Sequence, residues 1–396
     1  MITDLTKRVA PGQSAPSAAA TLALGFRPFF LAAGLFAASA MPLWLVVFLG
    51  GRSLPTNLAP SAWHGHEMIY GFVVPVIAGF LLTAARNWTG QAMPNGASLA
   101  ILVLVWLGGR VGVAFSGALP TSLGAVVDLV FIPMLAWAVG RPLVRTKNWR
   151  NIGLLVPLAL LFGANAFFHF GAPGSASRAM RLAIDSVILL VVVIGGRVIP
   201  SFTENAVRVT TVRRVWLDWL SLVSVAVTAV LDVLPSAATW AGVAAIAAGL
   251  SNAARLAGWR TRATRGQPIL WVLHLGYAWL AFGLFVSGVA TFMTWPATAP
   301  LHALTVGAIG LMVLGMMSRV SLGHTGRMLN VGRPIVVAYV LLATAAAVRA
   351  LGPLLVPSAY RWEILISGVL WTLAFALFAI TCVPILTTPR LDGRPG

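Results

Sequence analysis

Histidines and a few acidic side chains are the residues of this sequence that suit chemistry, and several of them open one apolar run. The stretch Trp63 to Phe72 reads WHGHEMIYGF, which places two histidines and a glutamate close together. Imidazole exchanges protons near neutral pH and is the commonest metal ligand in proteins, with haem iron and copper among its partners. The candidate metal ligands are the six histidines of the chain: His64, His66, His169, His274, His302 and His324.

Helix geometry limits how the two histidines of this stretch act together. Residues two apart on a helix point about 200° from each other, so His64 and His66 serve different partners unless the helix begins between them. Glu67 suits a hydrogen bond to a ligand imidazole or a proton relay, while its structural interpretation is a first-turn acid favoured by the helix dipole. Asp185 has two interpretations of its own, a side chain that lines a proton path or one that bonds a nearby helix.

The elements that position these residues are membrane-spanning helices. The chain is 59% hydrophobic and 9% charged, with a mean hydropathy of +0.91. A helix crosses the bilayer in about 20 residues, and twelve apolar runs of suitable length recur. The fold class is therefore an all-α integral membrane protein. The expected spans are residues 23–50, 64–86, 97–118, 122–141, 152–171, 179–200, 215–233, 238–257, 268–292, 300–320, 334–352 and 362–386.

The net charge of +18 belongs to this membrane topology. No loop is long enough to form a basic soluble domain, so nucleic acid is not an expected partner. Most Lys and Arg residues fall in alternate loops, on the side that also holds the N-terminus. Under the positive-inside rule, this bias predicts that both termini are cytoplasmic. Arg110 and Asp128 fall at similar depth in adjacent spans and are expected to form a structural ion pair, and the alternative is a contact with a cofactor.

The chain also divides into a leader, one membrane domain and a tail. Residues 1–22 are expected to be a disordered cytoplasmic leader, residues 23–386 the twelve-helix domain, and residues 387–396 a cytoplasmic tail. A gapless alignment places His66 on His302, Gly71 on Gly307 and Gly79 on Gly315, which suggests an internal repeat. The expected repeats are three parallel four-helix units at about 23–143, 152–257 and 268–386.

This topology separates the histidines into two groups. His64, His66, His169 and His302 lie at the outer edge, and His274 and His324 lie toward the cytoplasm. The rise of 1.5 Å per residue separates the groups by about 15 to 25 Å, so two sites are expected. The inner pair has Arg27, Arg197 and Arg327 at similar depth, and these arginines suit the anionic groups of a cofactor. Each histidine also has a structural interpretation, a bond to a neighbouring helix, but ionisable groups at membrane depth are usually functional.

Eight motifs, occurring in order, resemble those of the NnrS family. The resemblance implies a multi-pass protein of the bacterial inner membrane that contains haem b and copper. It implies a role in nitric oxide metabolism and in protection against nitrosative stress during denitrification. All six histidines fall inside the motifs, and the lone Cys382 leaves haem to be held by histidine. The motifs are GFRPFF, WHGHEM, GFLLTAARNWTG, NAFFH, GGRVIPSFT, ILWVLHLGY, LHALTVGAIG and SLGHTGR.

The layout also looks like subunit I of the haem-copper oxidases and nitric oxide reductases, by analogy of architecture. The sequence departs from that superfamily because it has no adjacent His-His pair. We expect His66 and His302 to be the haem ligands, since the alignment places them at equivalent positions, with His64 and His169 left for copper. The rival ligand assignment puts His64 or His169 on the iron.

The resemblance does not decide whether nitric oxide is turned over, sensed or sequestered. An oxidoreductase would need an electron donor, which the sequence does not identify. The alternative function is a secondary transporter that uses intramembrane His, Asp and Arg side chains as substrate or proton sites.

Overall fold

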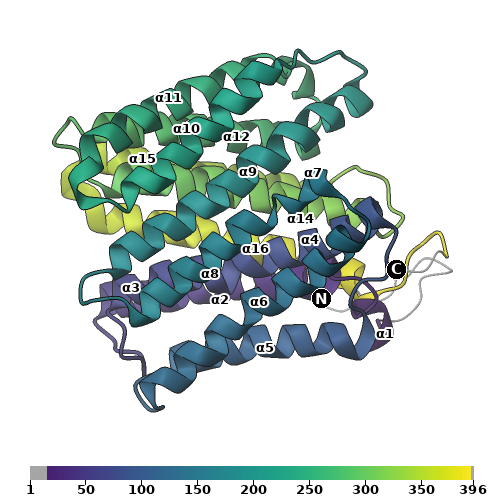
Figure 1. Cartoon of the computed structure of the whole chain (residues 1–396), viewed down its shortest axis with the longest axis horizontal. Coiled ribbons are helices and arrows are strands. Elements are labelled where there is room, and N and C mark those ends of the chain that lie inside the picture. The colour runs from purple at the N-terminus through teal and green to yellow at the C-terminus, as the bar shows by residue number, and fades with distance from the viewer. Residues whose placement is uncertain (1–15, 394–396) are drawn as a thin grey trace, which may run out of the picture.

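The computed structural model describes residues 16–393, and over that range it contains helices and no strands. Figure 1 shows the long helices side by side, with α5 (Gly96–Ala114) along one edge and α11 (Ala238–Ala257) along the other. The other long segments are α2 (Phe26–Gly50), α3 with η1 and α4 (Pro60–His66, Glu67–Val73 and Val74–Thr89), α6 (Thr121–Arg145), α8 (Leu155–Phe170), α9 (Ala176–Val207), α10 (Val215–Asp232), α12 (Pro268–Ala290), α13 with η4 and α14 (Thr298–His302, Ala303–Gly310 and Leu311–Gly323), α15 (Arg333–Leu355) and α16 (Tyr360–Thr387). Short elements are α1 (Ala18–Thr21), α7 (Trp149–Ile152), η2 (Pro235–Ala237), η3 (Thr261–Thr264) and η5 (Pro357–Ala359).

The expectation of an all-helical multi-pass membrane protein is confirmed. Within residues 16–393, eleven helices are long and apolar enough to cross a bilayer. Each coincides with an expected span to within a few residues at most ends. The remaining expected span, residues 238–257, forms α11 over the same range but is less apolar than the other eleven. The twelfth crossing and the orientation of the termini therefore stay predictions.

The reduced hydropathy of α11 comes from polar residues whose partners lie on the two helices packed against it, α10 and α12. Arg255 donates from Nε to Asp218 Oδ1 on α10 at 2.8 Å, and from Nη1 to the Tyr277 hydroxyl on α12 at 2.6 Å. That hydroxyl donates in turn to Asn252 Oδ1 at 2.5 Å. Because each polar group is paired inside the protein, α11 can lie among apolar neighbours without the large cost of an unpaired charge.

The helix that carries the opening histidines is the most enclosed of the eleven. In the segment Pro60–Thr89, 78% of the most apolar stretch is buried inside the protein, against 33% in Val215–Asp232. Large apolar side chains on the outer helices project outward instead, as Trp137 on α6 does with 70% of its surface exposed. This division is typical of a membrane protein whose outer helices face lipid and whose central helices hold the functional groups.

Two π-helical segments support the pairing of the second and tenth expected spans. η1 begins directly after His66 and η4 begins directly after His302, the two histidines that the internal alignment matched. The matched glycines also pack alike, because Gly71 faces the Phe36 ring and Gly307 faces the Trp279 ring so closely that a Cβ would overlap either ring. Such π-turns are frequent at functional sites. The full three-unit repeat stays a prediction.

The ends of the described chain pack on each other, which corrects part of the expected leader. Residues 1–15 of that leader, and residues 394–396 of the expected tail, lie outside the described residues. Residues 16–22 are ordered: α1 is capped by Ser17, whose Oγ accepts from Ala20 N at 3.1 Å and whose backbone N donates to Thr387 O at 3.0 Å. The sequence analysis placed residues 16–22 in a disordered leader, but these bonds fix the segment against the end of α16.

Candidate metal centre

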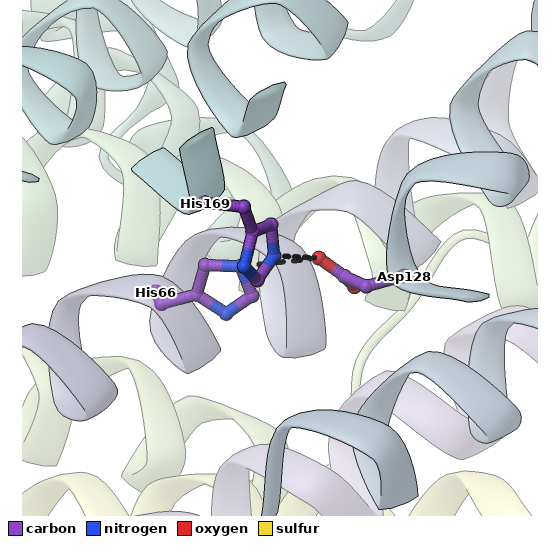
Figure 2. Close-up of side chains that lie close together, drawn as sticks. All are labelled: His66, Asp128 and His169. Carbon is purple, nitrogen blue, oxygen red and sulfur yellow. Dashed lines mark hydrogen bonds and ion pairs between the residues drawn. The ribbon is translucent and has the colours of Figure 1, made fainter. Parts of the chain in front are cut away.

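Four helical segments bring six polar side chains together near one end of the bundle. The continuous segment of α3 and η1 supplies two neighbouring residues, and α5, α6 and α8 supply the other four. All six lie mostly inside the protein, and His66 and Asn165 have no exposed surface. Figure 2 shows two of the imidazoles meeting one carboxylate. The residues of this polar cluster are His66, Glu67, Arg110, Asp128, Asn165 and His169.

Both ring nitrogens of His66 face oxygen atoms. Nδ1 lies 3.0 Å from Glu67 Oε1, and Nε2 lies 3.0 Å from Asn165 Oδ1 and 3.2 Å from Asp128 Oδ2. The hydrogen bond to Glu67 is the one expected for a carboxylate that orients a ligand imidazole. The rings of Tyr70 and Phe168 lie with centroids 4.7 Å from the His66 ring and shield it from water.

Asp128 is the hub of the polar cluster. Its Oδ2 lies 3.0 Å from His169 Nε2 and accepts from Asn165 Nδ2 at 2.7 Å. Its Oδ1 pairs with Arg110, whose other terminal nitrogen donates to Glu67 Oε1 at 2.7 Å. The expected ion pair between Arg110 and Asp128 is therefore confirmed, and Glu67 joins it.

The net charge of the polar cluster is negative, so the cluster can accept one more cation. Two carboxylates face a single guanidinium, so the cluster carries one net negative charge when both imidazoles are neutral. An unbalanced charge inside a protein is strongly unfavourable. Either of two cations would balance this negative charge. One is a proton on His66, because both of its ring nitrogens face acceptors, and the other is a metal ion bound in place of that proton.

The spacing of the donor atoms suits a metal ion. One ligand atom from each of His66, Asp128 and His169 lies within 4.8 Å of the other two. Atoms that bind one metal at about 2.0–2.1 Å in a tetrahedral arrangement lie about 3.3 Å apart. The 3.2 Å and 3.0 Å separations of the two imidazole nitrogens from Asp128 Oδ2 are close to that value. Two imidazoles and one carboxylate are a donor set that copper and zinc accept.

Sequence reasoning missed three members of the polar cluster as site residues. Arg110 and Asp128 were expected chiefly as a structural ion pair, with a cofactor contact as the alternative, and Asn165 was not singled out. The NAFFH motif held the signal, because Asn165 and His169 are four residues apart and so share one face of α8. Nothing in the sequence shows that this face meets Asp128 on α6.

His64 and His302 lie in a different neighbourhood from His66. His64 stacks on Trp44, with ring centroids 4.5 Å apart and an interplanar angle of 15°. It lies close enough to His302 to interact with it electrostatically, and Arg349 lies close to both. The structure thus brings His66 to His169 and His64 to His302, whereas the sequence analysis paired His66 with His302 and His64 with His169.

The two inner histidines have separate neighbours. The ring nitrogens of His274 lie 2.9 Å from Thr203 Oγ1 and 3.0 Å from Thr261 Oγ1, an arrangement that favours a structural role. The His324 ring packs on Phe26, with centroids 5.7 Å apart. Burial, together with the nearby Arg390 and Arg86, lowers the pKa of His324. The expected inner centre shared by both histidines stays a prediction.

The three arginines expected near the inner histidines also lie in separate neighbourhoods, with Arg27 and Arg327 together and Arg197 apart. Arg27 donates from Nη1 to the carbonyls of Leu386 and Thr388 at 3.0 Å and 2.7 Å, which satisfies the end of α16. Arg327 reaches Thr388 Oγ1 at 3.4 Å, beside Arg27. Arg197 instead donates to Asn151 Oδ1 at 2.9 Å.

Asp185 lies on α9, near Asp232 and Arg181. Its Oδ2 is buried and has no hydrogen-bond partner within residues 16–393. It is therefore separate from the hydrogen-bonded polar cluster around His66, and its role as a proton relay stays a prediction.

Comparison with models of known protein families gives a match to the NnrS protein family over residues 20–390. The matched range contains the polar cluster, all six histidines and every long helix. None of the curated proteins matches the chain.

Proposed function

The chain belongs to the NnrS family, and from this premise we propose that it binds haem b and copper and that it binds or converts nitric oxide at histidine-ligated centres. Family membership and the eleven apolar helices make it a multi-pass membrane protein of the nitric oxide response. The bacterial inner membrane is the proposed location. The single observation that carries the proposal is the buried group of His66, Asp128 and His169.

The residues of the polar cluster fit copper, and each has a defined task. His66, His169 and Asp128 would hold the ion. Glu67 fixes the tautomer and direction of the His66 ring through Nδ1, while Asn165 orients the Asp128 carboxylate. When bound, copper supplies a redox-active site for a diatomic ligand.

Arg110 and the aromatic residues keep this centre compact and dry. The guanidinium bridges Glu67 and Asp128, so the two carboxylates stay together despite their like charges. Tyr70 also donates to Leu161 O on α8 at 3.0 Å and so holds η1 against that helix. Nitric oxide is small, neutral and soluble in lipid, so it reaches a centre among helices without an aqueous channel.

Turnover of nitric oxide would require an electron donor that docks from outside the chain. Binding or sequestration would not. The transporter alternative gains no support from the described residues.

The test is quantification of metal and haem, with optical spectra, in purified wild type and in His66→Ala, His169→Ala and His274→Ala variants. We expect wild type to contain copper and haem, and the first two variants to lose most copper. His274→Ala is the matched control, because within residues 16–393 both of its ring nitrogens hydrogen-bond to threonine hydroxyls and to no carboxylate or second histidine. A folded, colourless and metal-free wild type would overturn the proposed function.

A further inference from the structure

We propose that His64 and His302 are the two axial ligands of the haem and that Arg349 binds the haem carboxylates. This inference rests on the proposed function, because it assigns residues to a group that the function requires. It also replaces the expected pairing of His66 with His302. The observations are a second set of polar residues with several buried atoms, and the ring nitrogens of the histidines in that set.

The second set lies at the same end of the bundle as the polar cluster. His64 is on α3, His302 on α13, Arg349 near the end of α15 and Glu363 near the start of α16. Arg349 lies close to the other three. We call these four residues the outer set.

Several atoms of the outer set are buried without a hydrogen-bond partner. Within residues 16–393 these atoms are His64 Nδ1, Arg349 Nη1 and both carboxylate oxygens of Glu363. Arg349 is 8% exposed and Glu363 is 5% exposed, so bulk water does not satisfy them. Buried polar groups nearly always have partners. Two of them, His64 Nδ1 and Arg349 Nη1, are atoms that a bound group could contact, one as a ligand of iron and the other as a donor to a carboxylate.

The availability of ring nitrogens decides which histidines can share an iron atom. His66 has both nitrogens committed to oxygens of the polar cluster. His302 Nδ1 lies 2.7 Å from Thr298 O, and it must donate because a carbonyl oxygen can only accept. In a neutral His302 ring, Nε2 therefore carries the lone pair. His64 has an unpartnered Nδ1 and a ring plane fixed by the stacked Trp44. Within residues 16–393, each of these two histidines thus has a ring nitrogen with no recorded hydrogen bond, and the two residues lie close enough to interact electrostatically.

The number of ligands points to haem rather than to a bare ion. Zinc sites have three or four protein ligands, and blue-copper sites have at least three. In the described part of the chain, the only group of three or more His, Cys, Asp or Glu ligands with metal spacing is His66, Asp128 and His169. The outer set supplies two neutral imidazoles, which is the number that an iron already held by four porphyrin nitrogens requires.

Arg349 suits the two carboxylates that haem b carries. Its Nη2 donates to the Tyr360 hydroxyl at 3.3 Å, which holds the guanidinium in place and leaves Nη1 for another acceptor. Guanidinium and carboxylate form strong, directional pairs. Glu363 lies against Gly352 and near Arg349 without bonding to it, so it balances the positive charge at a distance.

The first experiment replaces each ligand by glycine and restores it from solution. Purified His64→Gly and His302→Gly proteins should each lose the six-coordinate low-spin spectrum of wild type, and added imidazole should restore it. His64→Met and His302→Met should keep a six-coordinate haem with a shifted spectrum, because methionine also ligates iron. His169→Ala should lower copper and leave the haem spectrum unchanged, and His274→Ala should change neither.

Three other results of these experiments would overturn the ligand assignment. Wild-type haem spectra in both glycine variants overturn the ligand assignment and leave the proposed function standing. Haem loss that is the same in glycine and methionine variants, with no response to imidazole, also overturns the assignment. Wild type without haem overturns both the assignment and the function.

A second measurement tests Arg349 without altering an iron ligand. Transfer of haem to apomyoglobin should be about tenfold faster in Arg349→Met than in wild type, because the variant loses the charge-assisted hydrogen bonds to the haem carboxylates. Arg349→Lys should fall between them, because it keeps the charge but loses the paired geometry. Arg361→Met is the control, because Arg361 contacts only the Leu49 carbonyl from an exposed position. Equal rates in wild type and Arg349→Met would exclude the carboxylate contact.

Discussion

Nε2 of His66 lies 3.2 Å from Oδ2 of Asp128, although the two residues come from different helices, and the same oxygen lies 3.0 Å from His169. One carboxylate therefore joins two imidazoles inside a membrane protein.

The Glu67 carboxylate should set the affinity of the centre for copper. In Glu67→Gln the amide can still hydrogen-bond His66 but no longer carries charge, so copper affinity should fall about 10- to 100-fold. Competition with a chelator of known affinity measures this change. Glu204→Gln is the matched control, because Glu204 pairs with Arg213 away from the polar cluster. Equal copper affinity in both variants would contradict the prediction.

Arg110 should contribute more to stability than a peripheral arginine. Its removal in Arg110→Met leaves two buried carboxylates without their cation, which should cost about 3–5 kcal/mol. The exposed pair of Arg213 and Glu204 should contribute at most about 1 kcal/mol, so Arg213→Met serves as the comparison. Thermal unfolding in detergent, followed by circular dichroism, measures both. Similar losses in the two variants would show that the buried network is not strongly coupled.

Copper should stabilise the folded protein through the polar cluster. A ligand present at about 100 times its dissociation constant and bound only to the folded state adds about 2.7 kcal/mol. Chelation of the metal from wild type should therefore lower the unfolding temperature, and restored copper should raise it again. His169→Ala should show little response to either treatment. A full response in that variant would place the copper elsewhere.

The π-helical turn after His66 should depend on the small size of Gly71. A Cβ at this position would overlap the Phe36 ring, so Gly71→Ala should cost about 1–3 kcal/mol. Gly163 on α8 has open space around it, and Gly163→Ala should be neutral or slightly stabilising. Unfolding curves of the two variants provide the comparison. Unchanged stability in Gly71→Ala would mean that η1 tolerates a larger residue.

The twelfth crossing can be tested at the two ends of α11. Reporter fusions after Ser236 should lie outside and fusions after Thr261 in the cytoplasm, because the arginines near the second position favour the inner side. Fusions at Lys147 and Gly174 give reference signals for the expected inside and outside. Reporters at Ser236 and Thr261 on the same side would show that α11 does not cross.

Local sequence signals determined the helices and the kinds of groups they carry. Apolar runs predicted nearly every long helix, because a segment in lipid must satisfy its own backbone hydrogen bonds. The alignment of His66 with His302 coincided with two π-helical turns at the same positions. The Arg110–Asp128 pair followed from similar depth in adjacent spans.

The tertiary structure decided which groups meet. Depth placed four histidines at one end of the bundle, but depth says nothing about the rotation of each helix or about which helices are neighbours. Those two variables brought His169 to His66 and His64 to His302. They also brought Asn165 into the polar cluster through a packed interface between α6 and α8. Such contacts depend on packing between segments far apart in the chain, so no local pattern in the sequence encodes them.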